Sequence, residues 1–229
     1  MSGNVFTDFE APWFIPRLES KLFCLIPDGA RPQTIPKGGI IVSEEDYPDK
    51  LVYVRKGVLE QSTVNYMLKK PFAVLSLCLA GTMTGRMLML SKYASPVRIT
   101  ALRKSEVIII PFEGVKQAIN ASFELYQMFT SYCSRCDQSE FAGMSIIGTR
   151  SAEERLKLFF QSVISAFPAS ADEGAWRTLP FKFSRNEIAS ITHTTRLTVD
   201  RVLAQWIKNG LYKNTGSSFL LHQDLFSDI

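Results

Sequence analysis

The chain has 229 residues, 46% of them hydrophobic and 21% charged, with a formal net charge of +4. This length predicts one or two packed domains, and the modest charge does not by itself favour a nucleic-acid partner. The apolar runs are shorter than a membrane span, and the N-terminus lacks a basic stretch followed by an apolar one, so we expect a cytoplasmic protein without membrane contact. The cysteines are too sparse for a disulfide scaffold: Cys24, Cys78, Cys133 and Cys136.

Short β-like runs fill the segment from Gln33 to Pro111. Turn signals rich in glycine, proline and aspartate separate them, at the spacing typical of an antiparallel barrel or double sheet. The expected strands are Ile40–Val42, Leu51–Val54, Val58–Glu60, Phe72–Leu79, Val97–Ala101 and Val107–Ile110.

A long helix is expected over Phe123–Ile147, where proline is absent. Its nearly heptad stripe favours pairing with the same helix of a second copy, and the alternative is packing on the chain's own β domain. Cys133 and Cys136, on adjacent turns, suit a metal or an intersubunit disulfide only with help from a partner, so small core residues are the favoured interpretation. The stripe consists of Leu125, Phe129, Tyr132, Cys136, Ser139, Gly143 and Ile147.

A hinge is predicted where Gly148–Ser151 interrupts this helix. Ser151 and Glu154 have the spacing of a capping box that begins a new helix over Arg155–Phe167. A loop is expected over residues 168–176, followed by a short strand over Leu179–Phe183.

Two short helices separated by a polar turn are predicted between Ser184 and Lys213. Ser184 and Glu187 form a second capping box, and Thr194 or Thr195 can cap the second helix after the turn at His193. Apolar residues recur at helical spacing: Ile188, Ala189 and Ile191 in the first helix, and Leu197, Val199, Val202, Leu203 and Trp206 in the second.

A small hairpin follows these helices. Asn209-Gly210 is a helix stop, and a turn over residues 214–218 separates the strands Leu211–Lys213 and Phe219–His222. This winged helix-turn-helix pattern predicts DNA binding. The local charge agrees, because the basic residues Arg185, Arg196, Arg201, Lys208 and Lys213 face only Glu187 and Asp200.

The order of β-roll, long helix, hinge and winged helix resembles the CRP/FNR family of bacterial transcription regulators, from about Gln33 to Leu221. The resemblance implies an α+β fold: an antiparallel β-roll of the cyclic-nucleotide-binding jelly-roll type over residues 1–122, a dimerisation helix and hinge over 123–149, and a winged helix-turn-helix over 150–229. It also implies a homodimer on a palindromic site in double-stranded DNA, with RNA polymerase as a partner. The motifs that carry the likeness include Lys37-Gly38, Leu51-x-Tyr53-Val54-x-Lys56-Gly57, Gly81-x-x-x-Gly85, Ser184-Arg185-x-Glu187-Ile188-Ala189 and Thr198-Val199-x-Arg201-Val202-Leu203.

The resemblance also assigns DNA contacts. Arg196, Leu197 and Arg201 occupy the positions that face base edges, and Arg201 is the expected guanine contact. Many relatives have glutamate where Leu197 stands, and leucine offers only apolar contact, for instance to a thymine methyl. The alternative for Arg196 is a phosphate contact alone. The residues expected near phosphates are Ser184, Arg185, Thr195 and Thr198.

The effector is expected to differ from cyclic AMP. Members that bind cyclic AMP have a Gly-Glu pair in the phosphate cassette and an Arg-Ser pair shortly after it, where this chain has Gly85-Arg86 and Pro96-Val97. On the long helix, their Thr-Ser pair that meets the base is replaced by Glu140-Phe141. What remains resembles members that sense a small organic anion, such as the halogenated-phenol sensors of dehalorespiring bacteria. Arg86 is then either an anion anchor or a salt-bridge partner. The candidate effector-binding residues are Gly85, Arg86, Met87, Arg98, Glu140 and Phe141.

No cofactor is expected from the residues present. Oxygen-sensing members hold an iron–sulfur cluster through N-terminal cysteines, whereas Cys24 stands alone, and haem-binding members need a histidine in the β domain, whereas the histidines are His193 and His222. No catalytic constellation or metal spacing supports an enzyme. Two alternatives stay open: a redox-responsive regulator acting through Cys133 and Cys136, or a regulator that needs no effector.

Overall fold

The structure is a computed structural model that describes residues 10–44, 46–47, 49–65, 67, 70–86, 89, 94–167, 172–179, 181–216 and 218–227. The chain divides into two compact units. The first is Phe14–Glu140, and the second combines the N-terminal stretch up to Trp13 with Phe141–Ile229. Helix α2 (Phe123–Thr149) therefore contributes residues to both units.

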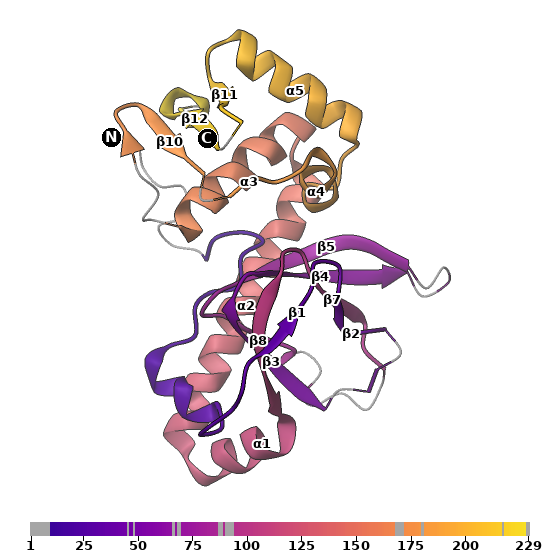
Figure 1. Ribbon diagram of the computed structural model, residues 1–229, viewed down its shortest axis with the longest axis vertical. Helices are drawn as coiled ribbons and strands as arrows, with labels where there is room; N and C mark the ends of the chain where they lie inside the picture. The colour runs from indigo at the N-terminus through magenta and orange to yellow at the C-terminus, as the bar shows by residue number, and fades with distance from the viewer. Residues whose placement is uncertain are drawn as a thin grey trace. The chain divides into compact units, whose positions relative to one another are not determined.

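Two four-stranded antiparallel sheets form a β-roll in the first unit (Figure 1). The predicted double sheet is confirmed, and every strand that was predicted between Gln33 and Pro111 is present. Strands β1 and β6 were not predicted, because Gln33–Ile35 and Met83–Thr84 lack the run of β-branched apolar residues that indicates β2. One sheet has the order β1 (Gln33–Ile35), β8 (Ser105–Pro111), β3 (Lys50–Lys56), β6 (Met83–Thr84), and the other β2 (Ile40–Val42), β7 (Val97–Ala101), β4 (Val58–Asn65), β5 (Lys70–Leu79).

Alternation along the strands places one hydrophobic core inside the roll. In β7, for example, Val97, Ile99 and Ala101 are buried while Arg98 and Thr100 are only half-buried. Helix α2 completes this core, because its buried side chains pack in the same cluster as those of both sheets. These α2 residues are Phe129, Tyr132 and Cys136.

The prediction that this stripe of α2 pairs with a second copy is therefore wrong for the middle residues of the stripe. Phe129, Tyr132, Cys136 and Ser139 are at most 4% exposed within the single chain. The alternative, packing on the chain's own β domain, is the correct one for these residues. Heptad spacing shows that one face of a helix is buried, but it does not show what covers that face.

Helix α1 (Phe112–Ala121), which follows the roll, was not predicted. Its N-cap is Pro111, and no side chain caps its first turn, so the usual signal of a helix start is missing. The 3₁₀ helix η1 (Ser20–Leu25) precedes the roll and buries Leu22 and Leu25.

The second unit contains α3 (Ala152–Ala166), α4 (Arg185–Ile191) and α5 (Arg196–Lys208), and it confirms the predicted winged helix-turn-helix. Both predicted capping boxes are formed, at Ser151 with Glu154 and at Ser184 with Glu187. Gly210 ends α5 in the left-handed region, with φ of 70°. The sheet has the order β11 (Tyr212–Asn214), β12 (Phe219–His222), β10 (Trp176–Thr178), β9 (Asp172–Glu173), and the 3₁₀ helix η3 (Gln223–Phe226) follows it.

The strand predicted over Leu179–Phe183 is wrong. Leu179 and Phe183 are both buried, and this alternation imitates a strand, but the described residues between them join no sheet. The strand lies earlier, at β10, which begins at the last residue of the predicted loop, and β9 lies within that loop. There Trp176 pairs with His222 of β12.

An aromatic cluster in the second unit includes Trp13 from the N-terminal stretch. Trp13 is fully buried, and its ring meets that of Phe159 edge to face with centroids 6.0 Å apart. Gly143 makes the space, because a Cβ at that position would lie 2.9 Å from the indole ring. The φ of Trp13, 64°, is rare for a bulky residue, so tertiary packing fixes this conformation.

Within the described part of the chain, no helix combines the length and the apolar character that crossing a bilayer requires.

Candidate DNA-binding surface and effector site

Helix α5 has one buried face and one exposed face. Val199, Val202, Leu203 and Trp206 are buried, and the hydroxyl of Thr195 caps the helix by accepting a hydrogen bond from the Thr198 N–H. The opposite face exposes Arg196, Leu197 and Arg201. Leu197 is 79% exposed, so its assignment to the apolar core face is wrong, whereas its exposure suits the base-reading position.

The turn between α4 and α5 is held by backbone hydrogen bonds. The N–H of Thr194 donates to the carbonyl of Ala189, and the guanidinium of Arg155 donates to the carbonyl of His193. His193 adopts a positive φ of 52° at this corner. In α4, Ile188, Ala189 and Ile191 are buried as predicted. The exposed face of α5 is therefore presented by a rigid pair of helices.

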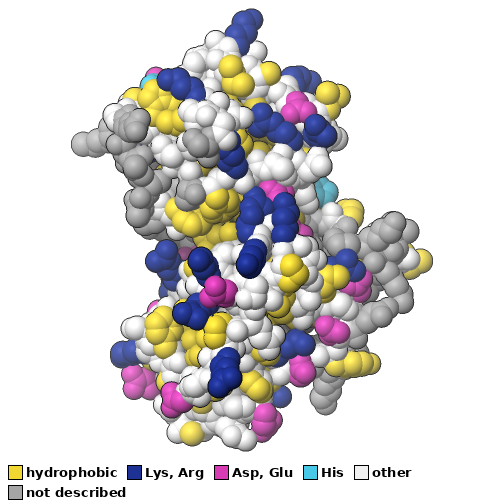
Figure 2. All heavy atoms as spheres, viewed as in Figure 1, with side chains coloured by type: hydrophobic (Ala, Val, Ile, Leu, Met, Phe, Trp, Pro, Cys, Tyr) yellow, Lys and Arg dark blue, Asp and Glu magenta, His cyan; other side chains and the backbone are white. Residues whose placement is uncertain are grey.

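Positive charge gathers on this exposed face, and Figure 2 shows Lys and Arg side chains over α5. Arg201 is exposed and makes no hydrogen bond or ion pair with any other residue that the structure describes. Arg196 is exposed too, with its Nε 3.7 Å from Asp200 Oδ2. Arg185 is the exception, because its guanidinium is half-buried and its Nε lies 3.2 Å from Asp200 Oδ1.

The hydroxyl groups of Ser184, Thr195 and Thr198, which were expected near phosphates, already make hydrogen bonds at the N-termini of α4 and α5. Ser184 Oγ accepts from the Glu187 N–H, and Thr195 shares a 2.9 Å hydrogen bond with the Thr198 hydroxyl. All three positions lie at helix N-termini, where backbone N–H groups favour an anion. In the wing, Lys182 Nζ donates to Asn214 and to the carbonyl of Gly216, which ties the hairpin turn to the unit.

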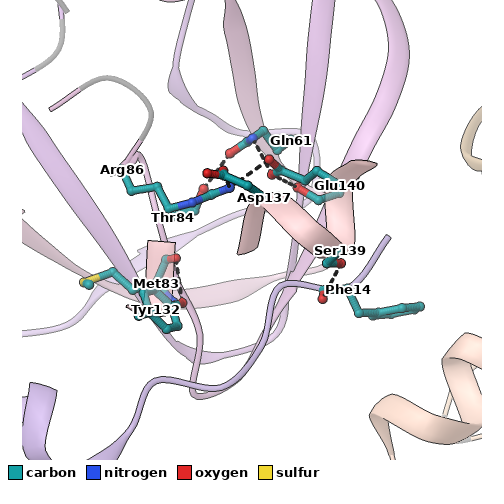
Figure 3. Close-up of polar contacts among 10 residues, drawn as sticks. Phe14, Gln61, Met83, Thr84, Arg86, Tyr132, Asp137, Ser139 and Glu140 are labelled. Atoms are coloured by element: carbon teal, nitrogen blue, oxygen red, sulfur yellow. Dashed lines mark hydrogen bonds and ion pairs between the residues drawn. The ribbon is translucent and has the colours of Figure 1, made fainter. Parts of the chain in front are cut away.

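A buried ionic cluster joins α2 to the roll in the first unit (Figure 3). Arg86 follows β6, and its side chain is only 2% exposed. Its Nη2 donates to Asp137 Oδ1 and to Glu140 Oε2 of α2, each at 2.8 Å. The other oxygen of Glu140 accepts from Gln61 Nε2 at 3.0 Å and from Ser76 Oγ at 2.9 Å. Residues of two strands and Arg86 thus fix the Glu140 carboxylate, and Arg86 also holds that of Asp137.

The guanidinium of Arg86 stays charged in this site. Burial by itself lowers its pKa, but the neighbouring Glu140 carboxylate raises the pKa above its ordinary value. Its Nε and Nη1 are buried and find no acceptor among the described residues. Two donors in a dry site therefore remain for an oxygen of a ligand or of water.

Among the other candidate effector residues, only Glu140 has a polar contact with Arg86 that the described part of the chain shows. Gly85 adopts a φ of 92°, and a Cβ there would lie 2.9 Å from the Lys50 carbonyl oxygen, which explains the glycine. Arg98 pairs with Glu44, and Phe141 is 63% exposed. Met87 lies outside the described residues.

Sequence reasoning missed Asp137, Gln61 and Ser76. Asp137 precedes Glu140 by three residues on a helix, so the two side chains share a face, and this signal was available. Gln61 and Ser76 are opposite each other in the β4–β5 register, which a sequence without a fixed pairing does not reveal.

The thiols near this cluster are held in the neutral form. Burial raises the pKa of Cys78 and Cys136 to about 12 and that of Cys133 to about 11. A neutral thiol is a poor nucleophile, so this environment does not favour redox chemistry at Cys133 and Cys136. In the described ranges, no three His, Cys, Asp or Glu side chains are grouped to hold a metal ion.

Comparison with known proteins agrees with this architecture. Residues 32–122 match the sequence model of the cyclic nucleotide-binding domain. FixK2 from Bradyrhizobium japonicum has a similar structure, with a TM-score of 0.70 and 16% identity over 87% of this chain and 96% of that one. A CRP/FNR-family transcriptional regulator from Thermus thermophilus has a TM-score of 0.65 and 15% identity over 86% and 96%. The chain has the fold of the CRP/FNR regulators.

A further similar structure of this CRP/FNR fold is CprK complexed with OCPA, with a TM-score of 0.66 and 12% identity over 95% of this chain and 97% of that one. A search of curated protein sequences finds no match. These neighbours are transcriptional regulators, as the first resemblance implied, and their low identity leaves the DNA and effector contacts to be argued from this chain's own residues.

Replacing Arg86 by methionine should destabilise the protein by about 3–5 kcal/mol, because Glu140 would be buried without a cation. The double variant Arg86→Met/Glu140→Leu should recover most of this loss, since both charges are removed together. Urea denaturation followed by circular dichroism measures the effect. Arg135→Met is the control, because its ion pair with Glu19 is exposed and should contribute at most about 1 kcal/mol. A double variant as unstable as the single one would show that the buried charge is not the cause.

Proposed function

We propose that this protein is a DNA-binding transcription regulator of the CRP/FNR type. It acts in the cytoplasm as a homodimer, with RNA polymerase as a partner, under the control of a small-molecule effector. The observation that carries the proposal is the exposed face of α5, where Arg196, Leu197 and Arg201 project from a helix whose other face is fully packed. A rigid helix with exposed arginines next to a wing is suited to the major groove of DNA.

In this proposal the exposed side chains of α5 read base edges. Arg201 donates to guanine O6 and N7, and Leu197 contacts a thymine methyl. Ser184, Thr195 and Thr198 bind phosphates from the helix N-termini. Arg185 also lies near the backbone, but its pairing with Asp200 gives it a second role in joining α4 to α5.

Changing Arg201→Ala should cost about 1–3 kcal/mol of binding free energy at the cognate site and much less on random DNA, because a guanine contact is lost. Fluorescence anisotropy measures both affinities, on a site that the full-length protein selects from a random pool. Lys208→Ala, at the other end of α5, is the control and should change both affinities alike. Equal losses on the two DNAs for Arg201→Ala would assign this arginine to a phosphate instead.

The homodimer is proposed to form along a different face of α2 from the one first expected. Tyr126, Phe141 and Met144 are 48%, 63% and 45% exposed, although they are large and apolar. They belong to a stripe with spacings of three and four residues, which is the pattern that pairs two helices. The stripe consists of Tyr126, Thr130, Cys133, Asp137, Phe141 and Met144.

A charge on this stripe should break the dimer. In Tyr126→Glu or Met144→Glu, the carboxylate would be buried against its symmetry mate without a cation. Sedimentation velocity should then show a monomer, and binding to the palindromic site should weaken. Gln138→Glu is the matched control, because it adds the same charge on an exposed part of α2 outside the stripe. Dimers of unchanged affinity in both stripe variants would place the interface elsewhere.

The effector is proposed to be a small organic anion held by Arg86, with Gly85, Met87, Arg98, Glu140 and Phe141 as the further candidates. The Nε and Nη1 of Arg86, which find no acceptor among the described residues, support this, because they can donate to a carboxylate or phenolate. Asp137 competes for the same guanidinium, and its side chain is 48% exposed, so it is the partner that a ligand displaces most easily. The similar structure of CprK is that of a complex with OCPA, which supports a small-molecule ligand for this fold.

Cyclic AMP should therefore leave the melting temperature and the DNA affinity unchanged, whereas a member of a panel of benzoates and phenylacetates should raise both. Asp137→Asn should bind that ligand several times more tightly, because a competing negative charge is removed. Asp224→Asn, an exposed change in the second unit, serves as the control. Micromolar binding of cyclic AMP by calorimetry, or a ligand response that survives in Arg86→Met/Glu140→Leu, would contradict the assignment.

A further inference from the structure

One carboxylate in the helix-turn-helix holds two arginines at once. Asp200 lies on the second turn of α5, with Oδ1 3.2 Å from Arg185 Nε and Oδ2 3.7 Å from Arg196 Nε. Arg185 is the first residue of α4, and Arg196 is the first residue of α5. Asp200 therefore connects the N-termini of the two helices that form the proposed DNA-reading surface.

Helix stability does not explain this arrangement. An arginine in the first turn lies at the positive end of the helix dipole, and α5 has no acidic residue in its first turn to offset Arg196. An arginine placed four residues before its acidic partner has the less favourable order for a helical pair. The Arg196 side chain is also 69% exposed, and an exposed pair of this kind contributes little to folding.

The geometry instead suits orientation of the guanidinium. Asp200 approaches Arg196 most closely at Nε, and the two terminal nitrogens of Arg196 make no hydrogen bond with the described residues. Those terminal nitrogens are the ones that donate as a fork to guanine O6 and N7. An arginine on a flexible stem loses side-chain entropy when it reads a base, and a carboxylate that already restrains the stem reduces that loss.

We propose that Asp200 is a positioning residue that directs Arg196 to a guanine rather than to a phosphate. The inference rests on the proposed function and deepens it. It has a second electrostatic consequence, because a carboxylate on a helix facing DNA repels phosphates and weakens binding to DNA of any sequence. Asp200 thus favours specific over non-specific binding in two ways, by restraining Arg196 and by opposing random contacts.

The test uses the full-length protein and a site that it selects from a random DNA pool. Each guanine of the half-site is replaced in turn by 7-deazaguanine, which lacks the N7 acceptor, symmetrically in the two halves. At one position the wild-type protein should lose about tenfold in affinity, the size of a single good base contact. The same replacement should not lower the DNA affinity of Arg196→Ala any further, and this result identifies the guanine that Arg196 reads.

At the guanine that Arg196 reads, the loss of affinity caused by 7-deazaguanine (the 7-deazaguanine penalty) should largely disappear in Asp200→Ala. The affinity of this variant for random DNA should rise. Asp200→Asn, which keeps the shape and an acceptor oxygen but not the charge, should retain most of the penalty and still bind random DNA more tightly. Arg185→Met removes the other arm of the bridge and should leave the penalty unchanged. A variant that loses the 7-deazaguanine penalty but gains affinity for random DNA has lost the orientation of Arg196, whereas a destabilised variant would bind both DNAs more weakly.

The inference is overturned if Asp200→Ala keeps the full 7-deazaguanine penalty, or if no guanine shows a penalty that depends on Arg196. It is also overturned if Asp200→Ala lowers affinity for both DNAs equally together with the melting temperature, or if Arg185→Met abolishes the penalty. Either of these last results would assign Asp200 to the packing of α4 on α5. Failure of the wild-type protein to select any sequence would instead reject the proposed function, and this inference with it.

Discussion

The contact between Arg86 and Glu140 places a charge pair inside the β-roll unit, where desolvation makes ions costly unless they are fully bonded. The structure meets that condition for the carboxylate, since Gln61 and Ser76 satisfy its second oxygen. The result is a fixed position of α2 against two strands. A hydrophobic contact would hold the helix as well, but it would tolerate small shifts along its axis, whereas directional bonds to a buried carboxylate do not.

The place of this pair in the chain gives it further importance. Glu140 is the last residue of the first unit, and the same helix continues at once into the second. A ligand that takes the Nη2 donor of Arg86 would change the bonds that this nitrogen makes to Glu140 and Asp137. Such a change would act directly on the helix that leads to the unit proposed to bind DNA, without a chain of intermediate side chains.

Sequence reasoning predicted most of the fold because the relevant signals were local. Both capping boxes, the glycine at position 210 and the alternation in β7 depend on residues within one turn of each other, and each is present in the structure. The exposed face of α5 was predicted in the same way. Leu197 was assigned both to the core and to the DNA surface, and only its exposure in the folded structure decides between them.

The parts that sequence reasoning missed depend on contacts between distant segments. Nothing near Arg86 in the sequence indicates that Gln61 and Ser76 lie opposite each other, or that α2 brings two carboxylates to the same place. The pairing face of α2 was misjudged for the same reason, because two stripes of similar spacing run along it. Deciding which stripe the roll covers requires the three-dimensional core, in which Phe129 and Tyr132 take part.

Trp13 makes the second unit discontinuous in sequence. Its indole ring lies against Gly143 and Phe159, so a fragment that starts at the boundary before Phe141 would lack one side of its own aromatic core. A buried tryptophan that is absent leaves a cavity whose walls lose their packing partners. Such a fragment would be an unreliable substitute for the intact second unit in structural or screening work. Supplying residues 10–13 in trans, as a short peptide, would be a natural way to complete it.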